Sequence, residues 1–124
     1  MRWDMGDVSG RYAALTKRLV DSVLAAPGHT ASELRRAIIA RAAWLGGRPP
    51  DPAEKARDVV PAPLAVYVDK VARHAYKVTD QDLAALKQAG NSDDVLFEVT
   101  VSAALGAALG RLERGLSALR GEET

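Results

Sequence analysis

The fold of this chain is decided by residues 79–119, which read TDQDLAALKQAGNSDDVLFEVTVSAALGAALGRLERGLSAL. Thr79 is typical of a helix start, because its hydroxyl can accept a free backbone N–H and acidic residues follow in the next turn. Gly90 is expected to end that helix, since glycine readily adopts the left-handed conformation of a C-terminal cap. Ser92 then begins a last helix that we expect to run to about residue 120.

The last helix offers two faces that look fit for burial. Glycine inside a helix costs up to about 1 kcal/mol relative to alanine, so two glycines four residues apart suggest that another backbone approaches closely. Packing within the chain and contact with a second subunit would both explain that spacing. One face holds the small residues Ser102, Gly106 and Gly110, and the other is a leucine-rich stripe of Val101, Leu105, Leu109, Leu112, Leu116 and Leu119.

Helical spacing of apolar residues also predicts the rest of the chain. We expect helices over 8–25, from Thr30 to about residue 45, and over 63–78, with a short one starting near Asp51. Glu33 lies three residues after Thr30, a spacing that predicts a capping box. No alternation typical of strands is present. The sequence therefore predicts one all-α domain spanning 1–124, a bundle of five or six helices with the last one central.

Composition limits the classes of function. The chain has 124 residues, of which 48% are hydrophobic and 5% aromatic, so alanine, leucine and valine must form the core. A net charge of +1 gives no electrostatic reason to expect nucleic acid as a partner. Arg2, Asp4 and Asp7 precede any apolar run, which argues against a signal peptide. We expect no segment long enough to span a membrane, and a cytoplasmic protein.

Metal, cofactor and phosphate sites are weakly indicated. The two histidines, His29 and His74, are far apart in sequence, and no H-x-x-x-H or Glu-x-x-His pair appears, so no metal and no cofactor is predicted. Arg35, Arg36 and Arg41 would suit phosphate or nucleic acid, but acidic residues are nearly as numerous in the chain. We therefore expect these arginines to form a solvated helix face.

Residues 68–116 resemble the helical core of the alkylhydroperoxidase D and carboxymuconolactone decarboxylase-like family. That family places a helix, a turn of glycine, amide or serine and acidic residues, and a long small-residue helix in this order. Here the turn is Gly90-Asn91-Ser92-Asp93-Asp94, and Gly110-Arg111 lies where the family often has an arginine. The resemblance covers 63–119 best and implies a homo-oligomer, most often a trimer or hexamer; otherwise we expect a dimer.

The chain departs from that family at its best-known reaction. The peroxidase branch uses a cysteine pair, which would fall near residues 75–76 and 78–79, and this chain contains no cysteine. We therefore expect no thiol peroxidase activity, because the attacking group is a thiolate. Three alternatives remain: acid–base chemistry of a lyase-like kind on a small molecule, a non-catalytic structural or binding subunit of the same fold, and an unrelated helical regulator.

Three side chains are the candidate catalytic groups. Glu98 falls within the leucine-rich stripe, where partial burial would raise its pKa as a general acid or base requires. Exposure at the end of the bundle, or pairing with an arginine, is the alternative. Tyr67 and His74 lie seven residues apart on one side of their helix and could donate or accept protons; an ordinary place at the edge of the core is the other interpretation.

Two basic residues are the candidate ligand-binding groups. Lys70 lies near Tyr67 and could pair with Glu98, bind an anion or be solvated. The family resemblance alone suggests Arg111. If the protein is catalytic, we expect Glu98 to face His74 or Tyr67 across a pocket between the 63–78 helix and the last helix.

Overall fold

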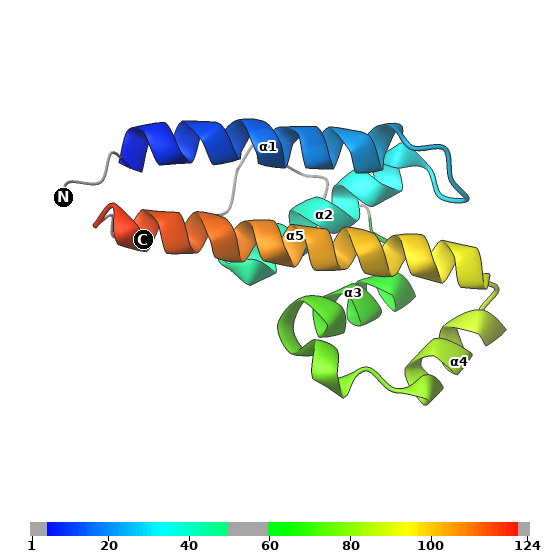
Figure 1. The fold of residues 1–124 in the computed structure, drawn as a ribbon. Helices are drawn as coiled ribbons and strands as arrows, with labels where there is room; N and C mark the ends of the chain where they lie inside the picture. The colour runs from blue at the N-terminus through cyan, green and yellow to red at the C-terminus, as the bar shows by residue number, and fades with distance from the viewer. Residues whose placement is uncertain (1–4, 50–59, 122–124) are drawn as a thin grey trace.

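The computed structural model describes residues 5–49 and 60–121, and these form helices joined by short turns (Figure 1). No strand occurs in those residues, so the all-α prediction is confirmed, with five α-helices. The short helix predicted near Asp51 lies outside the described residues. The elements are α1 (Met5–Ala25), α2 (Ser32–Gly46), α3 (Ala62–His74), the 3-10 turn η2 (Ala75–Lys77), α4 (Asp80–Gln88) and α5 (Asp93–Leu119).

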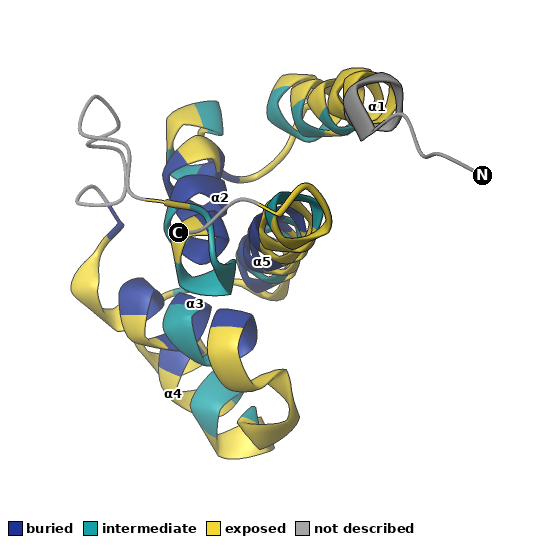
Figure 2. Cartoon of the chain, turned by 90° about the vertical axis from the view of Figure 1, so that its left-hand side faces the viewer, coloured by how far each residue is buried: buried dark blue, intermediate teal, exposed yellow. Residues whose placement is uncertain are grey.

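Helix α5 lies at the centre, as predicted, and packs against α1, α2 and α3. Figure 2 shows α2 and α5 side by side with their buried residues between them, α3 and α4 on one side of the pair and α1 on the other. The largest fully buried side chains come from three of these helices: Ile38 of α2, Val68 of α3, and Val99 and Ser102 of α5. The core is therefore built mainly from α2, α3 and α5, Leu86 of α4 joins it, and α1 is peripheral.

The small residues of α5 let α2 approach within the same chain. A Cβ added at Gly106 would lie less than 3.0 Å from the backbone of Ile39, and one at Gly110 would lie less than 3.0 Å from the backbone of Ala43. Gly46 of α2 makes the reciprocal contact, because a Cβ there would lie 2.5 Å from the carbonyl oxygen of Ala107. Packing within the chain thus explains the paired glycines.

The leucine-rich stripe of α5 mostly faces outward. Leu109 alone among its members is buried, whereas Leu105 and Leu116 are half-buried and Val101, Leu112 and Leu119 are exposed. The expectation that this stripe forms part of the core is wrong for most of its length. The reason is that the small-residue strip and the stripe point in different directions around α5, and α2 occupies the small-residue side.

The helix ends around α4 form as predicted. Thr79 and Asp82 make a complete capping box at its start. At its end Gly90 has φ of 104°, and the N–H groups of Gly90 and Asn91 donate to the carbonyls of Lys87 and Leu86. This pair of bonds satisfies carbonyls that the helix would otherwise leave free. The hydroxyl of Ser92 accepts from the Val95 N–H at 3.2 Å and starts α5.

Helix α3 is shorter than predicted, and the predicted capping box of α2 is wrong. α3 ends at His74 and η2 continues the chain to residue 77. The N-cap of α2 is Ala31, which has no side-chain cap bond. Thr30 is buried, and its hydroxyl donates to Glu98 of α5 rather than capping its own helix. A long-range carboxylate has replaced the local partner.

Two of the α2 arginines are structural, so a solvated face is the wrong description for them. Arg35 is buried, and its Nη1 donates to the carbonyls of Val23 and Ala26 at 2.6 and 2.9 Å. Those carbonyls lie at the C-terminal end of α1, where a cation is favoured by the helix dipole. Arg41 makes a two-pronged ion pair with Asp69 of α3. Arg36 is exposed, as expected.

Candidate functional site

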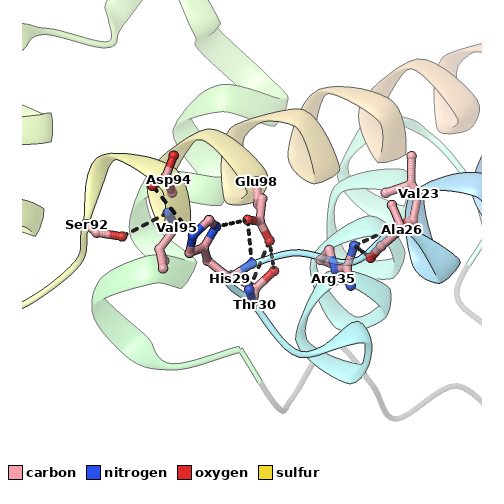
Figure 3. A network of polar contacts seen from close by, with 9 residues as sticks. All are labelled: Val23, Ala26, His29, Thr30, Arg35, Ser92, Asp94, Val95 and Glu98. Atoms are coloured by element: carbon pink, nitrogen blue, oxygen red, sulfur yellow. Dashed lines mark hydrogen bonds and ion pairs between the residues drawn. The ribbon is translucent and has the colours of Figure 1, made fainter.

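Glu98 accepts hydrogen bonds from the loop that joins α1 to α2 (Figure 3). Its Oε1 accepts from the Thr30 hydroxyl at 2.6 Å and the Thr30 N–H at 2.9 Å. Its Oε2 accepts from the His29 N–H at 2.7 Å and lies 3.2 Å from His29 Nδ1. The side chain is 17% exposed. Both carboxylate oxygens are therefore occupied by protein groups.

The pKa of Glu98 moves opposite to the prediction. Burial alone would raise that pKa, but the hydrogen bonds from Thr30 and His29 together outweigh burial and lower the pKa from 4.5 to about 2. Donors aimed at the charged form stabilise it. Glu98 is thus ionised at neutral pH and poorly suited to exchange protons there, and the expectation of a raised pKa is wrong.

The Glu98 contacts form a latch between the α1–α2 loop and the first turns of α5. His29 reaches two carboxylates of α5, because its Nε2 lies 3.6 Å from Asp94 Oδ2 while Nδ1 faces Glu98. Gly28 makes room for the latch, since a Cβ there would lie 2.6 Å from Glu98 Oε1. Sequence reasoning identified Glu98 and missed His29 and Thr30 as its partners.

The other predicted catalytic groups do not meet Glu98. Tyr67 is buried, and its hydroxyl lies 2.7 Å from Thr100 Oγ1, which itself donates to the Leu96 carbonyl. His74 is exposed at the end of α3, with its ring edge-on to Tyr76 at 5.9 Å between centroids. The described residues therefore contain no arrangement in which Glu98 shares a proton with Tyr67 or His74.

Arg111 makes a contact within the chain. Its Nη2 donates to the carbonyl oxygen of Ala72 at 2.5 Å, close to the end of α3. Like Arg35 at the end of α1, this guanidinium satisfies a carbonyl in the last turn of a helix, where cations are favoured. The contact joins α5 to α3.

Tyr67 and Lys70 do come together, in a groove of about 440 Å³ between α3 and α4. The Lys70 ammonium donates a hydrogen bond to Asp82 Oδ2 of α4 at 2.8 Å. Its carboxylate partner is therefore Asp82, and the pairing with Glu98 suggested by the sequence is not found. The volume lies in the range of small-molecule sites. The lining residues are Pro63, Val66, Tyr67, Lys70, Gln81, Asp82, Ala85, Leu86 and Ala89.

Ion pairs hold α4 on both of its sides. The Lys70 hydrogen bond, with help from the Thr79 N–H, keeps the pKa of Asp82 below its usual value although partial burial opposes this. On the other side Lys87 pairs with Asp93 of α5 at 2.8 Å.

A second groove of about 280 Å³ lies beside Lys87 and Asp93, and Tyr67 lines it as well. The Tyr67 ring is therefore the shared wall between the two grooves.

The described residues also bear on the predictions about metal sites and membrane-spanning segments. Within residues 5–49 and 60–121, no three His, Asp or Glu side chains are grouped so that they could hold a metal ion. In the same residues one helix, α5, is long and apolar enough to cross a membrane by length and composition alone. The expectation that no segment reaches this length is wrong, although one side of α5 is packed against α2 and α3.

Comparison with protein-family models, curated proteins and solved structures finds no match for this chain. The resemblance to the alkylhydroperoxidase-like family therefore stays a prediction, carried by the local order of α4, the Gly90 turn and α5.

Proposed function

We propose that this chain is a non-catalytic binding subunit, a cysteine-less relative of the alkylhydroperoxidase-like proteins that holds a small, largely apolar molecule between α3 and α4. The observation that carries the proposal is the groove between α3 and α4, in which two of the sequence-predicted site residues, Tyr67 and Lys70, meet. A homo-oligomer is part of the proposal, because a small alanine-rich chain gains stability by burying further surface between subunits.

The state of Glu98 argues against acid–base chemistry. A general acid or base needs a pKa near the working pH and reach to the reacting atom. Glu98 has a pKa of about 2, and His29 and Thr30 occupy both of its oxygens. A binding role requires neither a pKa near the working pH nor reach to a reacting atom. It requires a shaped groove with few polar groups.

The polar groups of the groove indicate the class of ligand. Lys70 and Asp82 form a pair that presents an N–H donor beside a carboxylate acceptor while their charges offset one another. A charged ligand would be attracted to one partner and repelled by the other. A neutral group that carries a donor next to an acceptor, such as a carboxamide, matches both. The apolar part of the ligand would lie along Val66, Ala85 and Leu86.

The test is a two-dimensional amide NMR titration with benzamide, which joins an apolar ring to a carboxamide. We expect saturable shifts confined to residues of α3 and α4 that line the groove, among them Tyr67, Lys70 and Ala85. Benzoate and benzylamine should shift the same signals less at equal concentration, because each meets one repulsive partner of the Lys70–Asp82 pair.

A pair of variants on α4 controls for non-specific binding. Ala85→Trp should fill the groove and abolish the shifts, and Ala85 is exposed, so the fold should tolerate the larger side chain. Ala84→Trp adds the same indole at an exposed position that lines neither groove, and it should leave binding unchanged. Absence of shifts at millimolar benzamide, or equal binding by the Ala85→Trp variant, would contradict the proposal.

A further inference from the structure

The outer face of α5 has a run of uncharged, exposed residues along most of the helix, with the charged residues Asp94 before the run and Arg111 at its edge. We call crest the uncharged, solvent-exposed positions of this run: Phe97, Val101, Ala104, Ala108, Leu112, Gly115 and Leu119. At 1.5 Å rise per residue the crest is about 33 Å long. Phe97 is 70% and Leu119 71% exposed, although both are large and apolar. A continuous exposed apolar surface of this length typically marks an interaction site.

The crest is self-complementary when it is read in opposite directions from Ala108. Leu112 and Ala104 are equally far from Ala108, so an antiparallel copy places each leucine against an alanine. Val101 and Gly115 are related in the same way, which places a larger side chain against a glycine. Phe97 and Leu119 meet at the two ends. Alternation of large and small residues across facing positions is what allows two helices to interdigitate.

Helix α1 extends this surface. Tyr12, Leu15 and Leu19 are about half exposed, and Tyr12 shares a groove with Leu112 of the crest. Together, the exposed apolar side chains of α1 and the crest amount to roughly 700 Å² per protomer, near the ~800 Å² per partner of a stable interface. The crest positions themselves carry no charge, and Arg111 at the edge of the crest donates to the Ala72 carbonyl of α3.

We propose that two copies of this chain associate about a two-fold axis through Ala108, with the α5 crests antiparallel and the α1 helices flanking them. An isologous contact requires a patch that is complementary to itself, and the crest meets that requirement. The proposal is independent of the groove between α3 and α4, because no crest residue lines that groove. It names the surface that the predicted homo-oligomer would use and a two-fold symmetry for it.

The absence of native cysteine makes the register of this contact directly measurable. In an Ala108→Cys variant the two thiols meet at the axis, and mild oxidation should convert most of the protein to a disulfide-linked dimer. In an Ala104→Cys variant the two cysteines would be offset by about 12 Å along the helices. Disulfides need Cα atoms within about 7 Å, so this variant should stay largely uncrosslinked.

Light scattering on the uncrosslinked protein supplies the second measurement. The wild type should have twice the chain mass of 13.2 kDa, or a higher even multiple. Ala108→Glu places two carboxylates at the axis, and should weaken association at least tenfold without harming the fold, because Ala108 is exposed in the single chain. Ala84→Glu, at an exposed position on α4, should leave the mass unchanged.

Three outcomes would overturn the two-fold contact. The first is a wild type that stays monomeric at about 100 µM, a concentration suited to detecting weak dimers. Equal crosslinking of Ala104→Cys and Ala108→Cys would show contact without the proposed register. A monomer that floats with phosphatidylcholine vesicles, and loses flotation in Ala108→Glu, would assign the crest to a lipid surface instead.

Discussion

At Glu98, N–H and O–H groups of His29 and Thr30 converge on one carboxylate, and several of them lose their partner if its charge is removed. We expect Glu98→Gln to lower the free energy of unfolding by about 1–3 kcal/mol, because the amide NH₂ must face donors where an oxygen accepted them. Urea unfolding measures this. Glu33→Gln, at an exposed position of α2, is the control and should stay within about 0.5 kcal/mol of wild type.

The same comparison carries a pH dependence. Because the folded pKa of Glu98 is about 2, below its ordinary 4.5, its contribution is fully present above pH 4.5 and is lost as pH falls through 2. The deficit of Glu98→Gln should therefore be constant near neutrality and shrink between those two values. Asp82 titrates in both proteins, so its effect cancels in the difference. A deficit that instead grows on acidification would contradict the assignment of the latch.

The partners of Glu98 show where sequence reasoning ends at this scale. Its place on the helical wheel, within the leucine-rich stripe, offered partial burial as one of two interpretations, and the side chain is 17% exposed. The wheel gives a direction and does not say what lies in that direction, and here it is a loop 68–69 residues away in sequence. Whether burial raises or lowers a pKa depends on the donors present, so the sign could not be predicted without that contact.

Among the elements, the α2–α5 contact depends most directly on single residues. We expect Gly110→Ala to destabilise the fold by about 1–3 kcal/mol, since the new Cβ would collide with the backbone of Ala43 and the two helices would have to separate. Gly10→Ala on α1 is the matched control, because a Cβ there meets nothing within 4 Å. It should be neutral or stabilise by up to about 1 kcal/mol, as alanine favours helices. Thermal unfolding of both variants measures the difference in stability. Equal effects of Gly110→Ala and Gly10→Ala would argue against the close approach of α2 to α5.

Helix ends were predictable where their chemistry is local. Thr79, Gly90 and Ser92 cap as expected because each acts on backbone groups within a few residues. Thr30 has the same local signals but turns to Glu98, a tertiary partner. The inner face of α5 was ambiguous for a related reason: both faces are apolar, and only the position of α2 decides which one is buried.

For the whole molecule, the all-α class and the central last helix followed from periodicity and length. The mutual placement of the helices could not be predicted from those signals. The expected meeting of Glu98 with Tyr67 or His74 depended on that placement and is not found. The exposed crest of α5 is the molecular-scale consequence: a helix with two apolar faces can bury one of them within its own chain, as α5 does against α2 and α3, and the other stays exposed in the single chain. That exposed face is the one we propose for the two-fold contact.

The reactivity of the whole protein follows from its composition. Peroxide reduction by a thiol enzyme starts with a thiolate attacking the peroxide oxygen, and this chain has no cysteine. We expect metal-free protein to reduce cumene hydroperoxide with dithiothreitol no faster than buffer does. Loss of hydroperoxide is measured with and without protein, after treatment with a chelator and an absorbance check for haem. Protein-dependent turnover that survives these treatments would require a group other than a thiolate to attack the peroxide, and would contradict this prediction.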